Sequence, residues 1–139
     1  MRKNLRPEEL GDLLEQPLVA VLATHRSDGG VLLSPVWHQW RDGGFDVVSR
    51  GDDVKTRHLR RDPRANIVVY EHVPPYRGIE VRCEARLEQA PREAIRGIAI
   101  RYLGERDGAA YTAAEGAADD TLIRLEPGRL RAWDFADQL

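Results

Sequence analysis

Short segments in which apolar and polar residues alternate follow one another along this chain, separated by glycine, proline and aspartate. The clearest of them covers residues 78–88, where charged residues take every second position. Its apolar positions are Ile79, Val81, Cys83, Ala85 and Leu87. A period of two predicts a half-buried strand in this segment. Residues 18–24 are instead almost continuously apolar, which predicts a strand buried on both faces.

Turn-forming residues separate further segments with strand character. These segments are residues 31–40, 45–49, 65–71 and the two arms, 121–125 and 130–135, of a final hairpin. The hairpin turn is Glu126-Pro127-Gly128-Arg129, and short connections of this kind favour antiparallel pairing. The chain of 139 residues is therefore predicted to be one mainly β domain, in which antiparallel strands form a closed or partly closed barrel.

Helical patterns are fewer. Pro7 suits the first turn of a helix that Pro17 ends, and three leucines of that segment share one face. Pro91 opens a second helix, whose apolar stripe is predicted to face the core. The members of this stripe are Ile95, Ile98, Ala99 and Tyr102. Residues 108–118 are small and of low complexity, which predicts a loop.

Composition and charge exclude several classes of protein. The net charge is −2, so no overall attraction to nucleic acid or to anionic membranes is expected. Cys83 is the single cysteine, which forbids an internal disulfide and is consistent with a reducing compartment. No apolar run approaches the roughly 18 residues of a spanning helix, and the N-terminus lacks a signal-peptide core. We expect a cytoplasmic protein, and we expect no metal site because the four histidines lack paired-ligand spacing.

The densest cluster of charge lies in residues 50–64, where six lysines and arginines accompany three aspartates. Lys55 is predicted to lie in the first turn of a short helix just after Ser49, where an ammonium group can bind a phosphate. Spacing alone leaves a solvated basic helix face as an equal alternative. The chain has no dinucleotide-binding glycine motif, no P-loop and no nucleophile elbow. We therefore expect a bound cofactor to supply any chemistry.

Four stretches of the chain match one family in order. They are residues 21–24 with 33–37 (LSPVW), residues 48–49 with 55–64 (KTRHLRRDPR), residues 77–81 with 84–85, and residues 123–127 with 131–134. In these stretches the chain resembles the pyridoxamine 5'-phosphate oxidase-like split β-barrel superfamily, and within it the F420 (deazaflavin)-dependent reductases. The resemblance spans nearly the whole chain, and the run from Lys55 to Arg64 is its most specific part.

The resemblance implies a homodimer of split β-barrels with two flavin-type cofactors at the subunit interface. Backbone groups of one strand would line the cofactor ring, at Ser34, Pro35, Val36 and Trp37. The cofactor phosphate would be held, with help from the N-terminus of the following helix, by Ser49, Arg50, Lys55 and Thr56. Two residues would approach the same site from the other subunit, namely Arg77 and Trp133.

The activity that the resemblance implies is hydride transfer between reduced F420 and a small unsaturated substrate. The alternatives are an FMN-binding oxidoreductase of the same fold and a non-catalytic carrier of flavin or deazaflavin. A nucleic-acid binder that uses residues 57–64 is disfavoured because its basic patch lacks interleaved aromatic residues. Arg57, Arg60 and Arg61 are expected either to attract the polyglutamate tail of F420 or to face water.

The chain also departs from the family pattern. His58 stands where many relatives carry asparagine, and residues 108–118 give no clue to substrate specificity. Dedicated basic contacts for a substrate phosphate cannot be assigned near the C-terminus, which disfavours pyridoxamine-phosphate oxidase activity proper. His38 and Tyr76 are candidate proton donors because they are expected to fall near the site.

Overall fold

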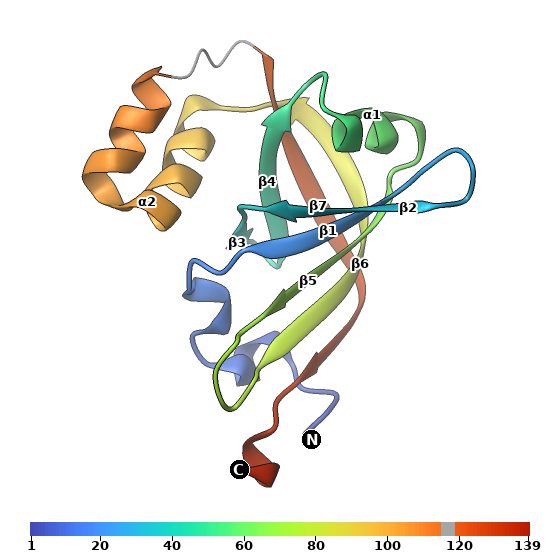
Figure 1. Ribbon diagram of the computed structural model, residues 1–139, viewed down its shortest axis with the longest axis vertical. Helices are drawn as coiled ribbons and strands as arrows, with labels where there is room; N and C mark the ends of the chain where they lie inside the picture. The colour runs from blue at the N-terminus through green and yellow to red at the C-terminus, as the bar shows by residue number, and fades with distance from the viewer. Residues whose placement is uncertain (115–118) are drawn as a thin grey trace.

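Seven antiparallel strands form one strongly curved sheet in the computed structural model, which describes residues 1–114 and 119–139 (Figure 1). Their order across the sheet is β2-β1-β5-β6-β7-β4-β3. The strands are β1 (Ala20–His25), β2 (Val31–Val36), β3 (Gln39–Arg41), β4 (Gly44–Arg50), β5 (Arg64–Tyr70), β6 (Gly78–Gln89) and β7 (Asp120–Trp133). The mainly β, antiparallel half-barrel confirms the fold class predicted from the sequence.

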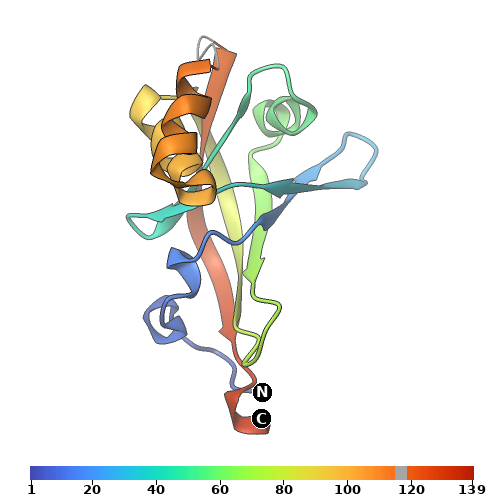
Figure 2. The same cartoon turned by 60° about the vertical axis from the view of Figure 1, so that its left-hand side comes forward.

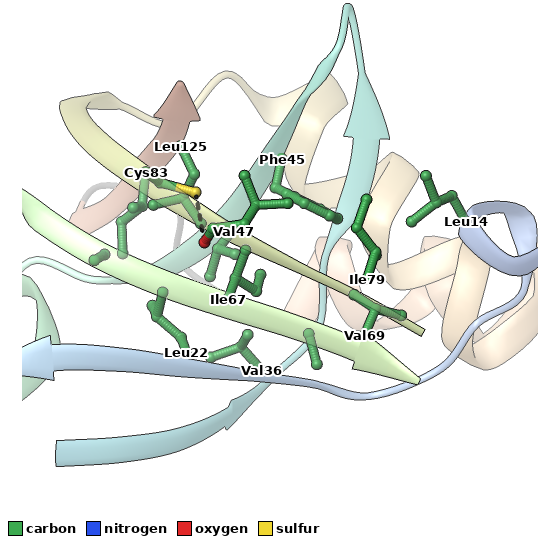
Figure 3. Packing of buried hydrophobic residues seen from close by; sticks show 14 of the residues in the cluster. Leu14, Leu22, Val36, Phe45, Val47, Ile67, Val69, Ile79, Cys83 and Leu125 are labelled. Atoms are coloured by element: carbon green, nitrogen blue, oxygen red, sulfur yellow. Dashed lines mark hydrogen bonds between the residues drawn. The ribbon is translucent and has the colours of Figure 1, made fainter. Parts of the chain in front are cut away.

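One face of the sheet carries the hydrophobic core, to which each of the five central strands contributes (Figure 3). Leu22, Ile67, Ile79, Leu125 and Phe45 come from β1, β5, β6, β7 and β4, and each is at most 1% exposed. Burial of a side chain of this size stabilises a fold by about 1.5–3 kcal/mol. The core therefore ties together strands that lie far apart in the sequence.

The alternation predicted for β6 is confirmed. Ile79, Val81 and Cys83 are buried, and Ala85 and Leu87 on the same face are partly covered. Burial raises the pKa of the Cys83 thiol to about 12, so this cysteine remains protonated at neutral pH and behaves as a small apolar residue.

The hairpin predicted near the C-terminus is wrong, because β7 is one long strand. It pairs with β6 on both sides of Pro127, and a bulge between Val81 and Cys83 absorbs an extra residue of β7. The pairing of β7 with β4 ends at Leu125. Pro127 therefore lies where β7 has a partner on one side only, a position at which a missing N–H costs little.

Two other strand predictions need correction. The segment predicted as one strand over residues 31–40 is divided into β2 and β3, which lie at opposite edges of the sheet. β1 is buried on one face only, because Val21 and Ala23 alternate with the fully buried Leu22 and Thr24. The nearly continuous apolar run thus supplies a second apolar surface outside the core.

Short helical turns replace the predicted N-terminal helix. η1 (Pro7–Leu10) and η2 (Leu13–Glu15) are separate 3-10 turns. Gly11 divides them with a positive φ of 60°, a conformation that glycine adopts without steric cost. A further turn, η4 (Ala136–Gln138), ends the chain close to its beginning (Figure 2).

Two longer helices complete the fold. α1 (Val54–Arg61) follows β4 directly, and α2 (Arg92–Ala114) consists of two helical segments that meet at Gly104 and lie side by side (Figures 1 and 2). The predicted stripe is confirmed for Ile95, Ile98 and Ala99, which are buried, while its fourth member, Tyr102, is half-buried. Residues 108–114, predicted as loop, are helical; residues 115–118 of the same prediction lie outside the described residues. Within the described chain, no helix combines the length and apolar character needed to cross a membrane.

Gly78 is expected to be intolerant of a side chain. A Cβ atom there would lie 2.3 Å from Cζ2 of Trp133, which packs flat on this residue from the neighbouring strand. Gly78→Ala should lower the free energy of unfolding by about 2–3 kcal/mol. Gly97→Ala is the matched control, since its Cβ would meet Gln39 Oε1 at 3.7 Å, and it should be neutral or stabilising by up to about 1 kcal/mol. Urea titration measures both, and equal stabilities of the two variants would contradict the prediction.

Candidate functional site

A cavity of about 270 Å³ lies where the end of β4 meets the start of α1 and the first segment of α2. One wall is polar and comprises Ser49, Arg50, Asp53, Lys55 and Asp120. The other lining residues are apolar or aromatic and comprise Trp37, Val48, Ile95, Ile98, Ala99 and Tyr111. Such a cavity suits a ligand that carries an anionic group on one side and a flat apolar body on the other.

The polar wall is held by the pairing of β4 with β7. Arg50 lies opposite Asp120, and the Gly51 N–H donates to the carbonyl oxygen of Asp119 at 2.7 Å. The Thr56 hydroxyl donates to the carbonyl oxygen of Arg50 at 2.8 Å, which ties the first turn of α1 to the end of the strand. Lys55 is thereby placed beside the cavity by backbone structure on both sides.

Asp53 contacts both the first backbone N–H of α1 and the ammonium group of Lys55. It is the N-cap of α1, and its Oδ1 accepts from the Val54 N–H at 2.7 Å. Its Oδ2 accepts from Lys55 Nζ at 2.6 Å and from Ser49 Oγ at 3.1 Å. The hydrogen bond from Lys55 is the main cause that lowers the pKa of the Asp53 carboxyl, so Asp53 is ionised at neutral pH.

The aromatic wall depends on a stack of two rings. Trp37 and Tyr102 lie parallel, with centroids 4.9 Å apart and an interplanar angle of 6°, and Tyr111 lies tilted at 5.9 Å from Trp37. The Tyr102 hydroxyl donates to the Leu18 carbonyl oxygen at 2.8 Å and accepts from the His38 N–H at 3.0 Å. These contacts fix the tryptophan ring in the cavity wall.

His38 follows Trp37 in the chain and is fully buried, with its ring edge-on to those of Phe45 and Tyr102. Its Nδ1 lies 3.0 Å from the Tyr102 hydroxyl, and Nε2 has no hydrogen-bond partner among the described residues. Burial is the main cause that lowers the pKa of His38 to about 4, with a smaller contribution from Arg101. The imidazole is therefore neutral and walled off from solvent, and it does not line the cavity.

Comparison with known proteins decides the family. A family model described as pyridoxamine 5'-phosphate oxidase matches residues 7–134. The chain belongs to this family. No curated protein matches the chain.

Solved structures share this fold. A conserved hypothetical protein from Mycobacterium tuberculosis is 23% identical, with a TM-score of 0.79 and coverage of 95% of this chain and 86% of that one. A structure named as an F420 reductase is 25% identical, with a TM-score of 0.68 and coverage of 90% and 98%.

More distant members of the fold differ in what their names say they bind. An FAD-binding protein from Mesorhizobium loti is 17% identical, with a TM-score of 0.66 and coverage of 94% and 93%. A heme-binding protein from Mycobacterium smegmatis is 22% identical, with a TM-score of 0.66 and coverage of 93% of this chain and 55% of that one. Structures that share this fold thus differ in the ligand that their names state, and their likeness to this chain shows the fold alone.

The cavity brings together four of the residues predicted for the family's cofactor site, namely Trp37, Ser49, Arg50 and Lys55. Thr56 lies beside them, fully buried, with its hydroxyl directed to the strand. Ser34, Pro35 and Val36 precede Trp37 on β2, where Pro35 is exposed and Val36 is part of the core.

The two residues predicted to act from the other subunit lie outside this cavity. Arg77 forms an ion pair with the buried Glu71 at 2.8 Å and another with Asp12 at 2.8 Å. Trp133 packs on Gly78, and Arg131 lies over its ring at 4.7 Å. Tyr76 neighbours Arg77 in sequence and is absent from the cavity lining.

Sequence reasoning did not assign Asp53, Tyr102 or Tyr111 to this site. Asp53 carried a signal, because an aspartate directly before a helix is a preferred N-cap. Tyr102 was predicted only as a core residue of the α2 stripe. Tyr111 fell in the segment predicted as loop, so the low-complexity composition hid a helical residue that reaches the cavity.

Burial of neutral His38 should make the protein less stable at acid pH. The imidazole binds a proton in the unfolded chain below pH 6.5 but resists it in the fold down to about pH 4, so the unfolded state binds more protons between these values. Stability should fall by about 2 kcal/mol from this residue between pH 6.5 and 5. Denaturant unfolding at both pH values should show this loss in the wild type and a loss smaller by that amount in His38→Gln. Identical pH profiles of the two proteins would refute the assignment.

Proposed function

We propose that this protein is an F420-dependent oxidoreductase, which transfers a hydride between reduced deazaflavin and a small unsaturated substrate. The observation that carries the proposal is the shared cavity of Lys55, Ser49 and Trp37, because it places a cation, a hydroxyl and an aromatic face around one space. The family membership and the structural likeness to an F420 reductase support the same class of activity.

The residues present fit the two parts of such a cofactor. Lys55 Nζ and Ser49 Oγ converge on a single oxygen of Asp53, which is the arrangement that a phosphate oxygen requires of its donors. The indole of Trp37, held by Tyr102, offers a flat face for the ring. When bound, the deazaflavin supplies the hydride chemistry; the protein contributes orientation and an apolar wall that excludes water.

Two alternatives use the same cavity. An FMN-binding oxidoreductase keeps the ring platform and exchanges the cofactor, and the FAD-binding protein of the same fold supports flavin as a candidate. A carrier of flavin or deazaflavin binds without turnover. A nucleic-acid function has less support, because Arg60 and Arg61 donate to the backbone carbonyl oxygens of Gly51 and His25.

For the location we propose the cytoplasm, since Cys83 is a buried free thiol.

We also propose that the protein is a homodimer. The face of β1, β2 and β5 opposite the core carries apolar side chains, and alternation places them on one surface. This outer face comprises Val19, Val21, Ala23, Val31, Leu33, Pro35, Val68 and Tyr70. Leu33 is 64% exposed, Val19 49% and Val31 48%. An apolar surface contributed by three adjacent strands fits a second copy of the same chain better than it fits water.

Lys55→Ala tests the cofactor site. Loss of a charge-assisted hydrogen bond should weaken F420 binding by about 10- to 100-fold. Arg57→Ala is the matched control, because Arg57 is an exposed cation of the same helix that does not line the cavity. It should change the binding of FMN, which has no polyglutamate tail, by less than about twofold at 0.15 M salt. Fluorescence titration with F420 and with FMN gives each dissociation constant.

The outcomes separate the candidates. Equal losses in the two variants would show that the helix attracts anions nonspecifically, which contradicts the site. Tighter binding of FMN than of F420 would favour the first alternative. Binding of F420 without reduction of any unsaturated substrate would favour the carrier.

Leu33→Glu tests the homodimer. A carboxylate within an apolar interface carries a desolvation cost, so the variant should shift from dimer to monomer in size-exclusion chromatography with light scattering. Leu103→Glu, at a 38% exposed leucine of α2, should leave the dimer intact. A wild-type protein that elutes as a monomer at micromolar concentration would contradict the proposal.

A further inference from the structure

The carboxylate of Asp53 holds the donors that the proposed cofactor site offers to a phosphate. Its Oδ2 accepts from Lys55 Nζ at 2.6 Å and from Ser49 Oγ at 3.1 Å. The Lys55 side chain is only 16% exposed, so its charge is directed to this corner of the cavity rather than to bulk water. Any anion that binds Lys55 must therefore share the lysine with Asp53 or displace it.

The rest of the polar wall does not add a surplus of positive charge. Arg50 and Lys55 are the cations among the described lining residues, and Asp53 and Asp120 are the acids. Arg50 also pairs with Asp52 at 3.3 Å. The cavity is thus close to electroneutral, whereas a site built for a doubly charged anion is expected to carry excess positive charge.

The charge of Asp53 is not required for its structural role. As the N-cap of α1 it uses Oδ1, and asparagine or serine caps a helix about as well as aspartate does. A neutral cap would leave Lys55 free for a ligand. The negative charge is a separate feature of this position, and the oxygen that faces the lysine is Oδ2, which the cap does not use.

We infer that Asp53 selects the charge class of the phosphate, favouring a singly charged phosphodiester, such as that of F420, over a doubly charged phosphate monoester, such as that of FMN. The inference rests on the proposed cofactor site and adds a specificity-determining residue to it. The repulsion energy between the Asp53 carboxylate and a phosphate grows with the charge of the phosphate. A diester carries a charge of −1 and a monoester about −2 above pH 6, so the repulsion is nearly twice as large for the monoester. The near-neutral cavity should therefore bind the phosphodiester with a more favourable free energy than the phosphate monoester.

The test compares three ligands that share one ring: the deazaflavin alcohol, its phosphate monoester and the methyl diester of that phosphate. Fluorescence titration at pH 8 gives the affinity that each phosphate adds over the alcohol. Wild-type protein should bind the diester more tightly than the monoester. Asp53→Asn should raise diester affinity on the order of tenfold and monoester affinity on the order of a hundredfold, so the preference should shift by about tenfold.

Controls keep this result specific. Asp52→Asn removes the same charge one residue earlier, at a side chain that is 76% exposed, and should shift the preference less than Asp53→Asn does. Asp53→Ser supplies a second neutral cap, and thermal unfolding checks that both Asp53 variants fold.

Each outcome bears on a different claim. A monoester bound as tightly as the diester by the wild type, or an equal gain for both ligands in Asp53→Asn, overturns the role of Asp53 while the phosphate site stands. If neither phosphate improves on the alcohol in the wild type or in the Asp53 variants, the proposed cofactor site itself fails, and this inference fails with it.

Discussion

Pairing between β4 and β7 determines where the cations of this protein lie. The ladder runs from Phe45 opposite Leu125 in the core to Arg50 opposite Asp120 at the rim of the cavity. α1 begins directly after this strand, so the direction of β4 sets the position of Lys55. The same β7 strand pairs with β6 on its other side. Core and candidate site therefore rest on one continuous strand, and a change of register there would displace both.

Lys55 illustrates how the site reconciles burial with charge. A mostly buried ammonium group needs a partner, because uncompensated charge is costly away from water. Asp53 supplies that partner and caps the helix with its other oxygen. In the aromatic wall, too, one residue has two roles. The Tyr102 hydroxyl forms hydrogen bonds with the backbone of Leu18 and of His38, and these bonds hold in place the ring on which Trp37 stacks. Both walls are thus preorganised by groups that also stabilise the fold.

Local pattern predicted most strands and the first segment of α2 because each of them obeys its own period. It failed where tertiary context decides: the turn-like residues around Pro127 lie inside β7, since only β6 pairs with that stretch. Gly104 permits a sharp bend between two helical segments, and low-complexity composition hid the second one. The residues around Lys55 identified it as a candidate phosphate ligand but left a solvated helix face equally open, and the family resemblance favoured the first role. The sequence marks Asp53 as a preferred helix N-cap, but its contacts with Lys55 and Ser49, like the position of Tyr111 in the cavity wall, arise only in the folded chain.

The central claim is that the phosphate of a deazaflavin cofactor binds at Lys55, with the ring against Trp37. A crystal structure of the protein with F420 tests it most directly. The account predicts phosphate density within hydrogen-bonding distance of Lys55 Nζ and Ser49 Oγ, and the ring beside the indole of Trp37. A ring seated instead in the groove of about 730 Å³ near Leu14 and Trp40, with the phosphate remote from Lys55, would contradict it.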